Sequence, residues 1–279
     1  MVLEQIYSSR WIERKSRYAF LMGLSYSIIG IASAMVLFPG DPGLAAIAFT
    51  SLLILPSLNI LLSVEENEAA RKEKFNLIGL FKDHNDIFKV YLFLFLGIML
   101  SFSFFSIAWP SIATSRIFTQ QVNVFGWAAG NAAYIKTGMF SSLLSNNLKV
   151  LVFCLLASLI YGSGSIFIIT WNASVWGTIF GMVARESALA SGHNPFVYFA
   201  LTIVAVFPHM ILEASSYFIA AISGGIVSKA VIREKPFSRR FTQIIEDGLI
   251  MFAIALVVLV IAVYIEAYVA GHLVKFIGL

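Results

Sequence analysis

The sequence predicts an all-α fold, a polytopic transmembrane helical bundle with about seven spans. Hydrophobic residues make up 59% and charged residues 12% of the 279 positions, whereas about 25% of the residues in an ordinary soluble domain are charged. The apolar residues form runs of about 18 to 25, the length that a helix needs to cross the hydrocarbon core of a bilayer. Runs such as residues 250–263 do not alternate between apolar and polar side chains, which excludes a transmembrane β-barrel.

Residues 1–17 are predicted to form an amphipathic helix that lies at the membrane interface. Apolar side chains recur there at helical spacing, opposite charged ones, the pattern of a helix that rests on a lipid surface. The apolar members are Val2, Leu3, Ile6, Tyr7 and Trp11.

Residues 18–110 are predicted to hold three transmembrane spans and a cytoplasmic polar helix. The spans are Tyr18 to Phe38, Leu44 to Leu62, and about Val90 to Trp109, and the charged stretch from Glu65 to Lys89 lies between the second and the third. Two prolines and two glycines within residues 39–43 predict a tight turn that makes the first two spans a hairpin. Pro110 is expected to end the third span.

Residues 111–147 form an outer apolar segment, which carries too many large hydrophobic side chains for a free linker. We expect this segment to pack on the membrane surface or to re-enter the membrane. Residues 148–279 are predicted to hold spans four to seven: Leu148 to Trp171, Ser174 to Ser191, Phe196 to about Lys229, and about Ile244 to Ala270.

The sixth span is too long for one straight crossing, since a helix of its length would extend over about 50 Å. Pro208 lies inside it and removes a backbone donor. We therefore predict a kinked or broken helix at Pro208.

Most lysine and arginine residues fall on one side of the membrane if the amino terminus is cytoplasmic, as the positive-inside bias requires. A re-entrant fifth span would reduce the count to six, but it would place the basic residues 229–240 outside. Seven spans are therefore preferred, with six as the alternative. The predicted location is the cell membrane, with multiple crossings and a cytoplasmic amino terminus.

Several function classes are not expected. Cys154 is the single cysteine and lies in an apolar run, so neither an intrachain disulfide nor a cysteine-based metal site can form. The basic residues lie beside the spans instead of forming the surface stripe of nucleic-acid binders. The sequence has neither a His-Glu-x-x-His motif nor a nucleophile elbow, which are signatures of metalloproteases and hydrolases. We predict no enzyme activity, no cofactor and no metal.

An intramembrane polar cluster is the candidate site. An ionisable side chain within a membrane costs about 2.5 to 3.5 kcal/mol on insertion scales, so each one needs a reason. His209 and Glu213 lie four residues apart and share one helix face. We expect them to meet the amides of Asn146, Asn147 and Asn172, either as a structural clasp beside the proline or as a proton or ion relay.

Small residues at four-residue spacing predict close helix packing. Within the chain we expect these contacts at Gly177 and Gly181, at Ala220 and Gly224, and at Ser158 and Gly162. The same stripes, together with the apolar segment 111–147, motivate the hypothesis of a homo-oligomer.

The order of features from Asn146 to Lys229 resembles the stage II sporulation protein M family. The residues that carry the resemblance are Asn146-Asn147-Leu148, Tyr161-Gly-Ser-Gly164, Asn172 with Gly177 and Gly181, Phe207-Pro-His209 with Glu213, and Ala220 with Gly224. Met210 and Ala173 stand where the family pattern has glycine, and the first two spans lie outside the match, which indicates a divergent or extended member.

The resemblance implies a non-enzymatic membrane scaffold or accessory subunit that anchors or organises partner proteins of the membrane or the cell envelope. The alternative function is a small-solute or ion transporter with a midplane site at His209 and Glu213, because a broken span with polar side chains at its break is typical of transporters.

Overall fold

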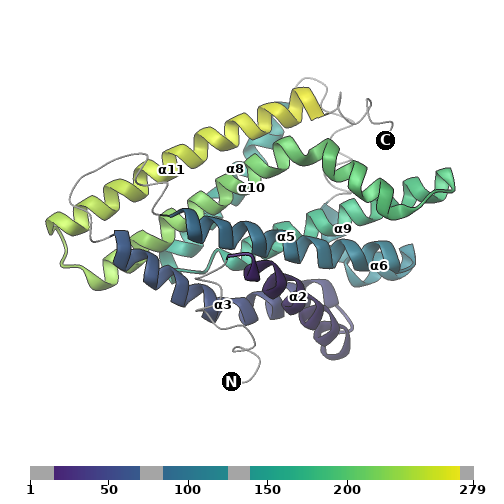
Figure 1. Ribbon diagram of the computed structural model, residues 1–279, viewed down its shortest axis with the longest axis horizontal. Coiled ribbons are helices and arrows are strands. Elements are labelled where there is room, and N and C mark those ends of the chain that lie inside the picture. The colour runs from purple at the N-terminus through teal and green to yellow at the C-terminus, as the bar shows by residue number, and fades with distance from the viewer. Residues whose placement is uncertain (1–15, 70–83, 125–138, 271–279) are drawn as a thin grey trace.

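The computed structural model describes residues 16–69, 84–124 and 139–270, and all the regular elements in these ranges are helices (Figure 1). Seven of the helices are long and apolar enough to cross a membrane, which confirms the predicted fold class and span count. They are α2 (Tyr18–Leu37), α3 (Pro42–Ala69), α5 (Asn85–Ala108), α8 (Met139–Tyr161), α9 (Ile166–Ser191), α10 (Pro195–Arg233) and α11 (Arg239–Ile265). The short α6 (Ser111–Ile117) follows α5, and a π-helical turn, η2 (Glu266–Ala270), continues α11.

Two sequence predictions lie largely outside the described residues. These are the interfacial helix at 1–17, of which only residues 16 and 17 are described, and the part of the polar helix at 70–83. The cytoplasmic position of the amino terminus remains a prediction.

The helices are layered around α5, α9 and α10. Figure 1 shows the α2–α3 hairpin on one side of α5 and the α8–α11 pair on the other side of α10. Phe218 of α10 joins the layers, because its ring stacks on Tyr91 of α5 at 5.9 Å between centroids and meets Phe95 edge-on at 5.7 Å. Helices α5 and α9 come close to backbone contact, since a Cβ on Gly181 would lie 2.7 Å from the carbonyl oxygen of Ser103.

The predicted boundary between spans four and five was wrong. Helix α8 ends at Tyr161 and α9 begins at Ile166, so the chain turns at residues 162–165 and continues as one helix through Asn172. Gly162 makes the turn with a φ of 51°, a conformation that glycine adopts without steric cost. Gly162 therefore turns the chain, whereas Gly177, Gly181 and Gly224 lie at helix contacts.

Helix α10 is helical through Pro208 and bends without breaking. All 39 residues from Pro195 to Arg233 are helical, with Pro208 inside, and Figure 1 shows α10 changing direction along its length. A proline removes one backbone donor and crowds one carbonyl, which a bend accommodates. Of the two predicted forms, the kinked helix is the one observed, and the broken helix was wrong.

The segment after α5 folds back into the bundle, and we call residues 111–124 the return segment. Its Phe118 is fully buried, with ring centroids 5.1 Å from Phe102 and 6.0 Å from Trp109. Gln121 is also fully buried and donates to the carbonyl oxygen of Gly43 at 3.3 Å. The described part of the predicted outer segment thus packs against the bundle, and residues 139–147 of that segment already belong to α8.

Candidate functional site

A polar row on α10 forms the centre of the candidate site. The helix is started by Asn194, whose side chain accepts a hydrogen bond from the backbone N–H of Phe196 at 2.8 Å, with Pro195 as the first helical residue. This is a standard N-cap, in which the missing N–H of proline has no cost. His209, Glu213 and Tyr217 then follow at four-residue spacing, which places them along one face of α10.

Glu213 is the buried carboxyl group of this row, with 6% of its surface exposed. The hydroxyl of Tyr217 donates to Glu213 Oε1 at 2.9 Å, and the side chain of Asn147 on α8 also hydrogen-bonds the carboxyl group. Asn146 donates in turn to Asn147 Oδ1 at 3.3 Å. An ionised carboxylate only accepts hydrogen bonds, so the amide N–H of Asn147 is the group that donates to Glu213.

Glu266 is a member of this cluster that the sequence did not reveal. It lies on η2, which packs against α8 and α10, and its carboxyl group is close enough to Glu213 for the two charges to interact. Its Oε2 atom is buried and has no hydrogen-bond partner among the described residues. The cluster therefore joins α8 and α10, the predicted fourth and sixth spans, with η2, and it does not include α9, which carries Asn172.

Two predicted members take other positions. The side chain of Asn172 donates to the carbonyl oxygen of Ile168 at 2.8 Å, a bond within α9, because α9 begins before Asn172 and makes it an interior residue. His209 is half-buried, and its Nδ1 atom has no hydrogen-bond partner in the described part of the chain. The histidine lies one turn from Glu213 but is not hydrogen-bonded to it.

The chemistry open to this cluster follows from its composition. Within the described ranges, no three histidine, cysteine, aspartate or glutamate side chains are grouped so that they could hold a metal ion. Two carboxyl groups, a phenol and two amides can hold helices together by hydrogen bonds, and carboxyl groups can also accept and release protons. A structural clasp and proton exchange are thus the two roles that the geometry allows.

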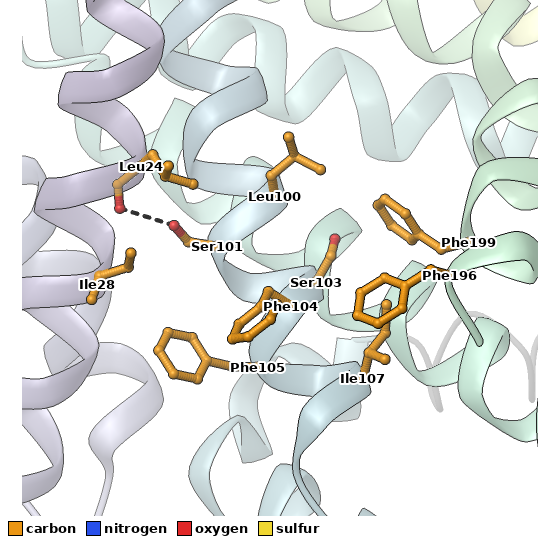
Figure 2. Close-up of a pocket in the computed structure, with 10 residues that line it drawn as sticks. All are labelled: Leu24, Ile28, Leu100, Ser101, Ser103, Phe104, Phe105, Ile107, Phe196 and Phe199. Atoms are coloured by element: carbon orange, nitrogen blue, oxygen red, sulfur yellow. Dashed lines mark hydrogen bonds between the residues drawn. The ribbon is translucent and has the colours of Figure 1, made fainter. Parts of the chain in front are cut away.

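A second candidate site is an apolar groove between α2, α5 and the first turns of α10, shown in Figure 2. Its volume is about 370 Å³. The hydroxyls of Ser101 and Ser103 line it but are already bonded, to Leu24 O at 2.9 Å and to Met99 O at 2.8 Å. The groove therefore presents apolar contacts. Its other lining residues are Leu24, Ile28, Leu100, Phe104, Phe105, Ile107, Phe196 and Phe199.

Comparison with known proteins places the polar cluster within a family. An uncharacterized protein of Methanocaldococcus jannaschii is 26% identical over 144 residues, which cover 50% of this chain and 74% of that protein. No solved structure matches the chain. The family model of stage II sporulation protein M matches residues 90–271, a range that includes Asn147, Glu213 and Glu266. Because this match spans more than half of the sequence, the chain belongs to the stage II sporulation protein M family.

Proposed function

We propose that this chain is a non-enzymatic scaffold or accessory subunit of the cell membrane, which anchors or organises a partner protein. The apolar groove between α2, α5 and α10 is the observation that carries the proposal. Both of its serine hydroxyls are bonded within the chain, so its occupant has to be apolar. An apolar transmembrane segment of a partner meets that requirement, because van der Waals packing drives helix association in lipid.

Helix α5, which forms one wall of the groove, is held rigidly by tight packing against α9. Helix α5 contributes most of the lining residues, and its opposite face meets α9 at glycines 177 and 181. Such close backbone approach resists sliding of one helix past another, because protein interiors are densely packed and transmit strain. A rigid groove loses less conformational entropy when a partner binds.

Affinity purification from native membranes tests the proposal with matched variants. Phe104 lies in the groove and Phe153 lies on α8, and both side chains are largely exposed, at 54% and 60%. We expect Phe104→Ala to lose a partner that wild type and Phe153→Ala retain. If a double variant with Phe104→Ala and Phe196→Ala retained every partner of the wild type, the groove would be excluded as the binding surface.

The alternative function, an ion or small-solute transporter, is favoured by Glu213 and Glu266 on facing elements with His209 one turn away. Carboxyl and imidazole groups inside a membrane mark proton and ion pathways in transporters. Proteoliposomes that contain a pH-sensitive dye test this function. A proton flux that wild type supports and Glu213→Gln abolishes, with the fold intact, would favour transport over the scaffold.

The scaffold proposal includes self-association, motivated by the exposed apolar helix faces; the small-residue stripes are used in contacts within the chain. We expect a homo-oligomer in mild detergent and in nanodiscs. A monomeric mass by light scattering in both media would contradict this expectation and leave the groove proposal unaffected.

A further inference from the structure

A row of buried hydroxyls runs along α9 at some distance in sequence from the Glu213 cluster. Thr170, Ser174 and Thr178 recur at every fourth position, so they share one face of the helix. All three side chains are fully buried. The return segment adds Gln121, which is also fully buried and donates to Ser174 Oγ at 3.4 Å. We call these four residues the hydroxyl seam.

Three polar atoms of the seam have no hydrogen-bond partner among the described residues: Thr170 Oγ1, Thr178 Oγ1 and Gln121 Oε1. Some hydroxyls elsewhere in the bundle donate to the carbonyl oxygen one turn earlier, as Thr50 does to Ala46 at 2.7 Å and Thr202 does to Tyr198 at 2.8 Å. Other buried hydroxyls without a partner among the described residues are scattered over several elements (Ser51, Ser106, Thr114, Ser158 and Ser163), whereas two of the seam's lie on one face of α9. Buried polar groups in proteins are nearly always hydrogen-bonded. These three atoms therefore need a partner beyond the described residues.

We propose that the hydroxyl seam binds ordered water molecules between α9 and the return segment. Residues four apart on a helix are separated by about 6 Å along its axis, and two hydrogen bonds between oxygen atoms span about 5.6 Å. One water molecule can thus bridge each pair of neighbouring hydroxyls. Gly43 packs closely against the amide, since a Cβ there would lie 2.7 Å from Gln121 Oε1, and this contact fixes the amide beside the seam.

Water fits the seam better than a cation does. The four seam side chains are all neutral, and the nearby carboxylate of Asp41 already accepts from the side chain of Gln120 at 3.0 Å and from the backbone of Leu44 at 3.4 Å. A cation buried without a facing carboxylate would have a large desolvation cost. A buried water needs two to four polar partners, which hydroxyls and an amide oxygen supply.

Valine substitution tests the proposal because valine matches the shape of threonine and lacks its hydroxyl. If the seam were dry, Thr178→Val would remove an unpaired polar group, and the melting temperature in nanodiscs would stay the same or rise. If the seam is hydrated, the water molecules lose a partner and the melting temperature falls. Thr202→Val is the matched control, since its hydroxyl bonds within its own helix.

We expect Thr178→Val and Thr170→Val each to lower the melting temperature by more than Thr202→Val does. Thr178→Ser keeps the hydroxyl, so we expect its melting temperature to lie closer to that of wild type. This variant replaces the valine variants in the comparison if they do not fold. Melting temperatures of both valine variants at or above that of wild type would overturn the proposal. So would a wild-type melting temperature that rises with sodium but not with a bulky organic cation, because that result would indicate a cation in the seam.

Discussion

Replacing Glu213 by leucine should destabilise the bundle, whereas replacing it by glutamine should not. Leucine removes the acceptor of the Tyr217 hydroxyl and of the Asn147 amide, and leaves both groups buried. Each buried polar group that loses its partner costs about 1 to 3 kcal/mol, so the two together predict a loss of about 2 to 6 kcal/mol. Glutamine keeps a carbonyl oxygen at the same place and is expected to cost less than about 1 kcal/mol.

Equilibrium unfolding in mixed micelles measures these free energies, and a double-mutant cycle separates the cause. Tyr217→Phe removes the hydroxyl that Glu213→Leu leaves without an acceptor. The double variant should therefore recover about 1 to 3 kcal/mol of unfolding free energy relative to Glu213→Leu alone. Equal stability of Glu213→Leu and wild type would refute the clasp, as would a double variant with no recovery.

Three further predictions concern packing, the α8–α9 turn and topology. Gly224→Ala should cost about 1 to 3 kcal/mol in unfolding free energy, because its Cβ would lie 2.8 Å from the Cβ of Ser158; unchanged stability would show that α8 and α10 can separate freely. Gly162→Ala, at a φ of 51°, should cost about 1 to 2 kcal/mol in the same assay, and a gain would contradict the turn. Ser238→Cys, made in a Cys154→Ser background, should react with a membrane-impermeant thiol reagent only from the cytoplasmic side, and labelling exclusively from outside would reverse the orientation.

The fold class and the number of spans followed from the sequence, because hydrophobic length is a local property of the chain. The helix boundary at residues 162–165 did not follow, since Gly-Ser-Gly-Ser is flanked on both sides by apolar residues and a hydrophobicity pattern passes through it. The turn depends on the positive φ of Gly162. The two closely spaced glycines were the available signal, but the prediction used Gly162 as a helix-packing residue instead of a turn residue.

The sequence predicted only those relations within the candidate site that depend on spacing within one helix. His209 and Glu213 share a face because they belong to one helix, and the adjacent pair Asn146-Asn147 also stood out. The approach of Glu266 to Glu213 depends on how α11 packs against α10, which helical periodicity does not encode. Gln121 was missed for the same reason, because its partners Gly43 and Ser174 lie on two other helices.

The length of α10 makes the protein sensitive to the thickness of its bilayer. Its 39 residues correspond to about 58 Å of helix, nearly twice the hydrocarbon thickness of about 30 Å. The bend lets the two parts of α10 tilt independently, so a thicker membrane can take up more of the helix and a thinner one less. Because such mismatch costs a fraction of a kcal/mol per ångström and sorts proteins among membranes, lipid chain length should alter the angle of the bend. The apolar groove has a rigid wall on α5 and a second wall that includes Phe196 and Phe199 on the first part of α10, so only this second wall would move with that angle.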